Sequence, residues 1–143
     1  MTIEPAGAED LAAVRALVAG SGLPLDGLDA CLDTLLVARD EARVAGCAAL
    51  EVHGAYGLLR SVAVMPGARG RGVGQLVTAE AVALARRLGL RAVFLLTETA
   101  SGFFPRAGFH AIPRNDVPVE VRQSVEFVSA CPASAAAMRL DLS

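Results

Sequence analysis

A glycine-rich segment carries the most specific chemical pattern in the sequence. Residues 69–75 read Arg-Gly-Arg-Gly-Val-Gly-Gln, with glycine at every second position, and they lie between a predicted strand and a predicted helix. Glycines let the backbone turn several N–H groups towards one point, and the N-terminus of a helix adds partial positive charge. The segment is therefore predicted to bind a phosphate or pyrophosphate, with extra charge from Arg69 and Arg71.

Three phosphate-binding patterns compete for this segment. The dinucleotide fingerprint G-x-G-x-x-G fails, because counting from Gly70 places Gln75 where its last glycine belongs. The Walker loop fails because the segment contains no lysine. The third pattern, Gln/Arg-x-x-Gly-x-Gly/Ala, is satisfied by Arg69, Gly72 and Gly74. An ordinary glycine turn with an exposed basic edge is the alternative.

Length and composition limit the classes of protein that the chain can belong to. Its 143 residues fit a single domain over 1–143, and 54% hydrophobic residues allow a sizeable core. A net charge of −2 argues against a nucleic-acid partner, and no apolar run approaches the roughly 20 residues of a membrane helix. Cys31, Cys47 and Cys131 form no CxxC pair, so we expect no metal site and a reduced, cytoplasmic protein.

The order of predicted elements indicates an α+β fold. Strands are predicted at residues 2–5, 36–39, 44–52, 56–64, 92–96, 109–112 and 136–142. Helical segments are predicted at residues 9–19, 26–35, 73–88, 101–107 and 116–129. Short turns around residues 40 and 53 predict an antiparallel meander, and the apolar run 92–96 predicts a buried parallel strand. Together they predict one mixed sheet with helices on both faces. Val121, Val125 and Val128 are expected to point inward from the last helix.

Two further stretches carry a resemblance to a known family. Residues 59–66 with the glycine-rich segment resemble the fourth strand and pyrophosphate loop of GNAT (Gcn5-related) N-acetyltransferases. Residues 103–109, Phe-Phe-Pro-Arg-Ala-Gly-Phe, resemble the short-helix motif of that family, and the element order matches over nearly the whole chain. The resemblance implies the acyl-CoA N-acyltransferase fold, acetyl-CoA as cosubstrate, no metal, and a small primary amine as acceptor. Residues 97–104 and 126–134 also resemble the subgroup encoded beside arsenic-resistance genes.

The family geometry implies how the cofactor is held. Two neighbouring parallel strands, 58–64 and 92–96, are expected to splay apart so that the pantetheine arm of CoA enters between them. The cofactor-binding residues that the resemblance implies are Val62, Ala63, Val64, Arg69, Gly70, Arg71, Gly72, Val73, Gly74, Gln75, Thr97, Ala100, Phe103 and Phe104.

Catalysis in the family is a direct attack of the amine on the thioester within a ternary complex. The main-chain N–H of Val62 or Ala63 is the candidate that polarises the thioester carbonyl. Glu98 is the candidate general base, with an exposed loop carboxylate as the alternative and a water chain as another route for the proton. In many relatives a tyrosine acts as the general acid at the position where this chain has Phe104. Water or Ser101 would therefore have to protonate the leaving CoA thiolate here.

Candidate acceptor-binding residues are Arg60, Arg122 and Glu126. Arg60 lies in a strongly apolar predicted strand, where burial is costly unless the charge is paired. It could bind a carboxylate of the acceptor, or form an internal salt bridge to Glu126 or Glu51. Glu126 could equally face solvent. An acceptor with both amine and acid groups, amino-acid-like or arsenic-containing, would suit these residues.

Two other functions compete with transfer. The missing tyrosine motivates a non-catalytic module that binds acetyl-CoA as a sensor or interaction domain. The arsenic resemblance motivates a metalloid binder that uses the Cys131 thiol, although small buried thiols such as Cys31 and Cys47 are commonly packing residues. Nothing in the sequence fixes an oligomer interface, and a homodimer stays open.

Overall fold

Strands and helices occupy most of the chain in the computed structural model, which describes residues 1–98, 103–130 and 135–142. The strands are β1 Thr2–Pro5, β2 Leu35–Asp40, β3 Arg43–His53, β4 Tyr56–Val64, β5 Ala92–Thr97, β6 His110–Ile112 and β7 Ala136–Asp141. The α-helices are α1 Leu11–Gly20, α2 Val73–Arg87, α3 Phe103–Arg106 and α4 Val119–Arg122. Shorter 3₁₀ turns cover Ala8–Asp10, Leu28–Thr34, Pro66–Ala68 and Arg114–Asp116, and a π-helical turn covers Glu126–Ala130.

The strands form one mixed sheet in the order β1-β2-β3-β4-β5-β7-β6. The first four strands form an antiparallel meander, as the short turns predicted. β4 and β5 are parallel neighbours, which confirms the prediction for the apolar run 92–96. β7 lies between β5 and β6 and is antiparallel to both. The predicted α+β architecture is therefore confirmed.

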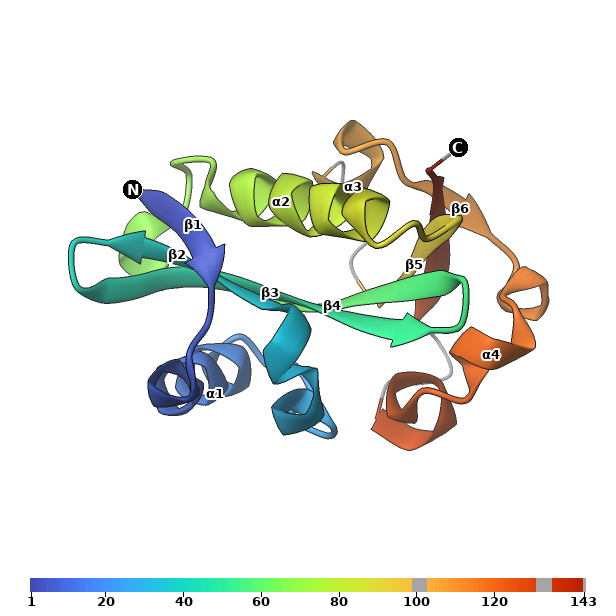
Figure 1. The fold of residues 1–143 in the computed structure, drawn as a ribbon, viewed down its shortest axis with the longest axis horizontal. Helices are drawn as coiled ribbons and strands as arrows, with labels where there is room; N and C mark the ends of the chain where they lie inside the picture. Colours follow the sequence, from blue (N-terminus) through green and yellow to red (C-terminus); the bar gives the residue numbers. More distant parts are fainter. Residues whose placement is uncertain (99–102, 131–134, 143) are drawn as a thin grey trace.

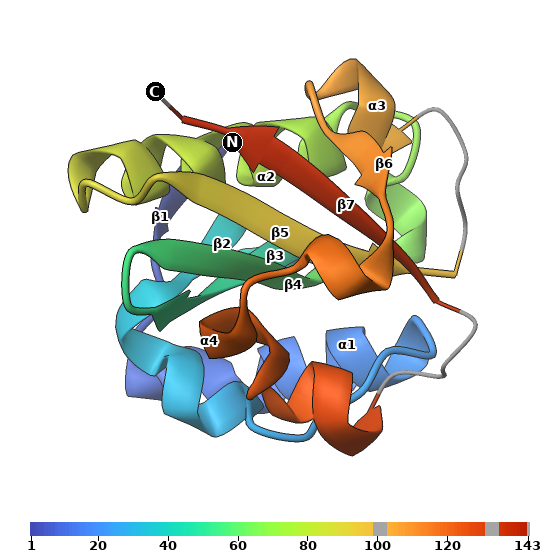
Figure 2. The same ribbon diagram turned by 90° about the vertical axis from the view of Figure 1, so that its right-hand side faces the viewer.

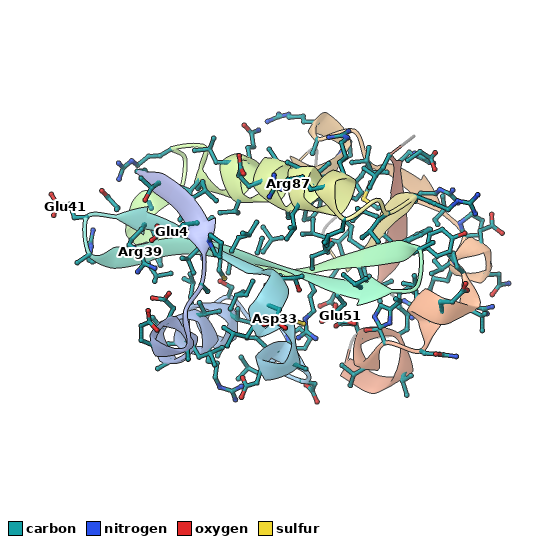
Figure 3. All side chains as sticks on the ribbon, viewed as in Figure 1. Glu4, Asp33, Arg39, Glu41, Glu51 and Arg87 are labelled. Carbon is teal, nitrogen blue, oxygen red and sulfur yellow. The ribbon has the colours of Figure 1, made fainter. Side chains whose placement is uncertain are left out.

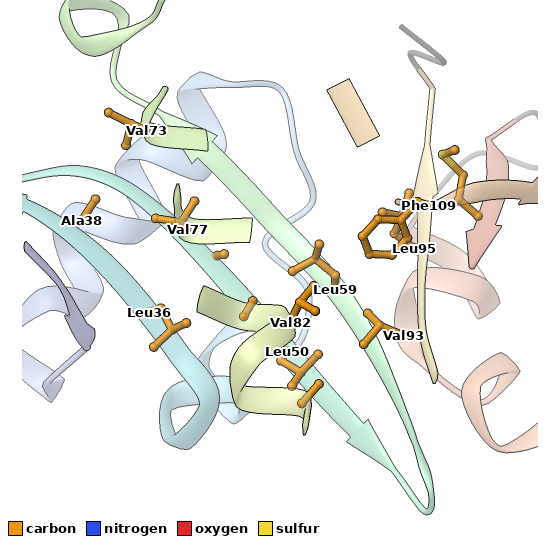
Figure 4. Packing of buried hydrophobic residues seen from close by; sticks show 14 of the residues in the cluster. Leu36, Ala38, Leu50, Leu59, Val73, Val77, Val82, Val93, Leu95 and Phe109 are labelled. Atoms are coloured by element: carbon orange, nitrogen blue, oxygen red, sulfur yellow. The ribbon is translucent and has the colours of Figure 1, made fainter. Parts of the chain in front are cut away.

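Helices cover both faces of this sheet (Figures 1 and 2). α2 packs on one face, with Val73, Val77, Ala81 and Ala85 buried at helical spacing. Figure 4 shows Val73, Val77 and Val82 of α2 beside side chains of β2, β3, β4 and β5. The other face packs on α1, on the turn Leu28–Thr34 and on α4, in two further apolar clusters. Burial on both faces holds the central strands rigidly enough to position a site at their ends.

The predicted helices near both ends of the sequence differ from those observed. The amphipathic segment 26–35 is a 3₁₀ turn that ends at Thr34, because Leu35 already pairs with β3. The predicted helix 116–129 is broken into separate short turns. Buried Ser124 interrupts it, since its Oγ accepts the N–H of Glu126 at 3.2 Å. Val128, expected to point inward, is consequently 70% exposed.

No helix among the described residues combines the length and the apolar character that crossing a membrane requires.

A partly exposed ion pair ties β2 to the residue before α1. Arg39 on β2 donates to both carboxylate oxygens of Asp10, at 3.1 and 3.0 Å. It also donates to Glu4 on β1, and Figure 3 labels both of these residues. Asp10 additionally accepts the N–H of Gly7 at 2.9 Å. The hydrogen bonds from Arg39 and then Gly7 hold the pKa of Asp10 below its ordinary 3.8, although burial opposes this.

We predict that Asp10→Asn removes a pH-dependent part of the stability. The carboxyl pKa is lower in the folded state, so its contribution is complete well above pH 3.8 and is lost as the pH falls through that value and below. Urea unfolding at a series of pH values should therefore show a deficit at pH 7 that shrinks below about pH 4. A deficit that is the same at every pH would contradict the ionic role of Asp10.

Candidate functional site

The central feature of the site is the separation of β4 from β5. The two strands pair only through Tyr56↔Ala92, Gly57↔Val93 and Leu58↔Phe94. Beyond Leu58, β4 continues with β3 and β5 continues with β7, so the edges of β4 and β5 that face each other are no longer paired. The splay that the family resemblance implied is confirmed, and two clefts open at this end of the sheet.

A β-bulge shapes β4 where the strands part. Between the pairs Ala49↔Arg60 and Cys47↔Ala63, β3 has one intervening residue and β4 has two, Ser61 and Val62. Ser61 adopts φ +57°, a left-handed conformation that costs a non-glycine residue roughly 1–2 kcal/mol. Such bulges redirect the strand and re-aim the residues that follow.

The first cleft, of about 610 Å³, extends from Val62–Val64 on β4 to the glycine-rich segment and α3. Gly70 and Gly72 both have φ +80°, a conformation that favours glycine. The first main-chain bond of α2 joins the Leu76 N–H to the Gly72 carbonyl at 3.0 Å. The N–H groups of residues 73–75 therefore have no main-chain acceptor among the described residues, and they are available to an anion at the N-terminus of a long helix.

The two arginines of the segment differ in their contacts. Arg69 is exposed and its Nε donates to the carbonyl of Val64 at 3.3 Å, which ties the segment to the end of β4. Arg71 is more than half exposed and lies 3.8 Å from Asp40. Arg69 lines the first cleft, and Arg71 does not.

Gly74 has a different role from Gly70 and Gly72. A Cβ at Gly74 would lie 3.0 Å from the Phe103 ring and 3.5 Å from Val64, so only glycine lets α2 approach α3 this closely. A Cβ at Gly72 would meet no protein atom within 4 Å. A side chain at Gly72 is thus disfavoured by its backbone conformation rather than by crowding within the protein.

The second cleft, of about 600 Å³, lies between β4 and β5 and is closed by the loop after α1. Both clefts share Ser21, Leu23, Val62 and Phe104 in their linings. Their common boundary is therefore the bulged end of β4 on one side and the short helix α3 on the other.

Arg60 is held by internal contacts and does not face solvent. Its side chain is 0% exposed, and its Nη1 lies 2.9 Å from Glu51 Oε2. Nη2 donates to the Pro24 carbonyl at 3.2 Å, and Nε donates to Ser61 Oγ at 3.1 Å and lies 3.5 Å from Glu126 Oε2. Of the two alternatives for Arg60, the structure shows the internal salt bridge, with both expected partners. Glu126 is buried rather than solvated.

Glu51 extends this network towards the surface. Burial alone would raise the pKa of Glu51, but hydrogen bonds from Ser124, His53 and Arg60 lower it below its ordinary 4.5. His53 Nε2 lies 2.7 Å from Glu51 Oε1, and His53 is half-buried at the end of β3. Glu51 therefore stays ionised beside Arg60 at neutral pH.

Of the other predicted site residues, some line a cleft and others do not. Thr97 and Glu98 at the end of β5 line the second cleft, and Glu98 is exposed. Arg122 is exposed on α4 and lines neither cleft. Ala100, together with Ser101, lies outside the described residues. Tyr56, the only tyrosine in the sequence, packs on Phe94 at the opposite end of β4 and lines neither cleft.

The two described cysteines, Cys31 and Cys47, are free, buried thiols. Burial raises the pKa of their thiols to about 11 and about 12. Both therefore stay protonated at neutral pH. No group of three His, Cys, Asp or Glu side chains that could hold a metal ion occurs in the part of the chain that the structure describes. Cys131 falls outside that part.

Sequence reasoning missed two parts of the site. The loop after α1 supplies Ser21–Pro24 and Asp26 to the second cleft, although its composition is that of any surface turn. The bulge at Ser61 leaves no trace in the pattern of β4, because a non-glycine residue occupies the left-handed position. Only the pairing of β4 with β3 reveals it.

Comparison with known proteins places these features in a family. The acetyltransferase (GNAT) domain model matches residues 32–111. The amino-acid acetyltransferase of Mycobacterium tuberculosis (strain ATCC 25618 / H37Rv) is 40% identical over 80 residues, which cover 55% of this chain and 45% of that protein. The amino-acid acetyltransferase of Aeromonas salmonicida (strain A449) is 31% identical over 91 residues, covering 62% of this chain and 21% of that protein. The chain thus matches less than half the length of these curated relatives.

Solved structures match over the whole chain. Rv2747 from Mycobacterium tuberculosis, in complex with CoA and NLQ, superposes with a TM-score of 0.86 at 28% identity and covers 100% of both chains. N-acetylglutamate synthase from Neisseria gonorrhoeae, complexed with coenzyme A and N-acetyl-glutamate, has a TM-score of 0.85 at 21% identity. It covers 99% of this chain and 35% of that chain, and at this identity it shows a shared fold.

We predict that Gly72→Ala weakens CoA binding about tenfold. A left-handed alanine costs roughly 1–2 kcal/mol, and when the backbone relaxes to avoid this cost, the N–H groups of residues 73–75 turn away from the phosphate. Gly67→Ala is the matched control, since Gly67 lies in the same connection with open space around it and without a positive φ. Isothermal titration calorimetry measures both. Equal affinities for the two variants would show that the left-handed conformation of Gly72, just before α2, does not contribute to the CoA site.

Proposed function

The chain belongs to the GNAT family of acetyltransferases, and we propose that it moves the acetyl group of acetyl-CoA to the primary amine of a small, amino-acid-like molecule. One observation carries the proposal: a cleft with a phosphate cradle and a second, acidic cleft meet at Val62 and Phe104. That arrangement brings a thioester and an amine to one point.

The first cleft suits acetyl-CoA. Its pyrophosphate would accept N–H groups from residues 70–75, and its pantetheine arm would run along Val62–Val64, whose edge towards β5 is left unpaired. Phe103 and Phe104 supply the apolar wall opposite. The CoA named for Rv2747 and for the synthase from Neisseria gonorrhoeae supports this assignment.

The second cleft suits an amine. Its charged lining residues, within the described chain, are Asp26, Glu98, Glu126 and Arg60. The guanidinium of Arg60 already faces Glu51 and Glu126, so the net field in the cleft is negative and attracts a protonated amine. Relatives named amino-acid acetyltransferase support an amino acid as acceptor.

The reaction follows from this meeting point. The amine loses a proton, to Glu98 or through water to solvent, and its lone pair attacks the thioester carbonyl carbon. We assign the stabilisation of the oxyanion to the main-chain N–H of Val62, which lies after the last β4–β5 pair and lines the cleft. The C–S bond then breaks, and the acetylated nitrogen gives its second proton to water. The CoA thiolate takes a proton from water, because Phe104 has none to give. No step requires a metal ion.

Phe104 also motivates a second candidate, a domain that binds acetyl-CoA without turnover and signals its level. The resemblance of residues 97–104 and 126–134 to the arsenic-associated subgroup adds arsenic-containing amines to the acceptors worth testing. The buried, unpaired thiols of Cys31 and Cys47 favour a reducing compartment such as the cytoplasm.

We predict that the protein releases free CoA thiol from acetyl-CoA in the presence of an accepted amine. A thiol reagent reports the release across a panel of amino acids, their amides and arsenic-containing amines. Glu98→Gln should lower kcat by about 100-fold if Glu98 takes the proton, whereas Glu80→Gln on the exposed side of α2 should not. Tight acetyl-CoA binding without release for any amine would favour the sensor instead.

We further predict that Phe104→Tyr raises kcat about tenfold, since a phenol at this position can protonate the departing thiolate. Phe127→Tyr, at a half-buried phenylalanine that lines neither cleft, serves as the control and should leave kcat unchanged. Steady-state rates under saturating acetyl-CoA decide the point. An unchanged or lower rate for Phe104→Tyr would show that thiolate protonation does not limit turnover.

A further inference from the structure

One buried guanidinium joins four separate segments around the second cleft. Arg60 on β4 contacts Glu51 on β3, Pro24 in the loop after α1, Ser61 in the bulge and Glu126 in the π-helical turn, at 2.9, 3.2, 3.1 and 3.5 Å. Every one of these residues except Glu51 lines the cleft. The walls of the cleft therefore depend on a common contact at its base.

The loop after α1 packs closely against the guanidinium of Arg60. A Cβ at Gly27 would lie 3.4 Å from Arg60 Nη1 and 3.1 Å from Val125, so the loop backbone lies directly against the charge. Gly27 has φ +74°, which lets the loop take this path. With a side chain that is 0% exposed and two carboxylates beside it, Arg60 has its charge balanced within the protein.

The contact with Ser61 connects Arg60 to the backbone that faces the thioester. Ser61 is held in its left-handed conformation by two hydrogen bonds: Oγ accepts from Arg60 Nε, and the carbonyl accepts from the Cys47 thiol at 3.2 Å. The next residue, Val62, is at the boundary of both clefts. A substitution of Arg60 can thus displace the main chain of Val62 through Ser61.

We propose that Arg60 is a positioning residue that fixes the acceptor cleft and the Val62 amide, and that it does not itself bind a carboxylate of the acceptor. The proposal rests on the proposed transfer reaction for its kinetic consequences. Its structural part does not depend on turnover: the contacts of Arg60 link the bulge, the loop after α1 and the π-helical turn, and we call this set of contacts the Arg60 clamp.

Arg60→Lys tests the clamp, because lysine keeps the charge but cannot supply the fork of donors. Arg87→Lys, at an exposed arginine on α2 outside both clefts, is the matched control. For Arg60→Lys we expect a CoA dissociation constant within about twofold of the wild type. We expect kcat/KM to fall about 100-fold, since small displacements of reacting groups have effects of that size.

An acceptor pair separates positioning from direct binding. The variant and the wild type are compared on an accepted amino acid and on its carboxamide, which lacks the negative charge. Positioning by Arg60 predicts the same fold loss for both acceptors. A loss confined to the acid would overturn the proposal, because it would show that the guanidinium binds the carboxylate.

Hydrogen exchange tests whether Arg60 stabilises the segments of the clamp, even if the protein acetylates no amine. In Arg60→Lys, amides of residues 21–27, 61–64 and 124–128 should exchange faster, while those of α2 keep their wild-type rates. Unchanged exchange in all three segments would overturn the proposal. If Arg60→Lys does not fold, Glu51→Gln, which keeps the shape and removes the charge facing Nη1, should show the same kinetic and exchange pattern.

Discussion

The separation of two parallel strands after three paired residues is the constraint on which the site depends. β4 and β5 stay together up to Leu58↔Phe94, and each then follows its other neighbour. A backbone edge that loses its partner must be satisfied by something else. Here the open edge borders a cleft that ends at the N-terminus of α2, so an extended, amide-bearing molecule with an anionic end satisfies both features at once.

Different contacts lie beside the separated strands on the two faces of the sheet. On the α2 face, Gly74 lets the helix approach Phe103 of α3 closely. On the other face, the contacts of Arg60 reach four segments. A guanidinium can do this because its donors point in several directions in one plane. The cofactor side is thus organised mainly by the backbone, and the acceptor side by buried charge.

Local patterns predicted the elements that local physics determines. β4 begins and ends where its pattern predicted, and the glycine-rich segment was identified because positive φ angles and an exposed helix N-terminus require particular residues. The bulge at Ser61, the broken helix around Ser124 and the pairing of Arg60 were not determined by local sequence. They follow from contacts between segments far apart in the chain. For Arg60, sequence reasoning named the right partners but could not choose between pairing and substrate binding.

Hydrogen exchange with and without CoA tests the central claim most directly. If the open edge of β4 and the start of α2 bind the cofactor, amides of residues 62–64 and 70–76 become protected on adding CoA, and the paired end of β4 around Tyr56 does not change. Protection confined to other parts of the chain, or none at all, would contradict the account.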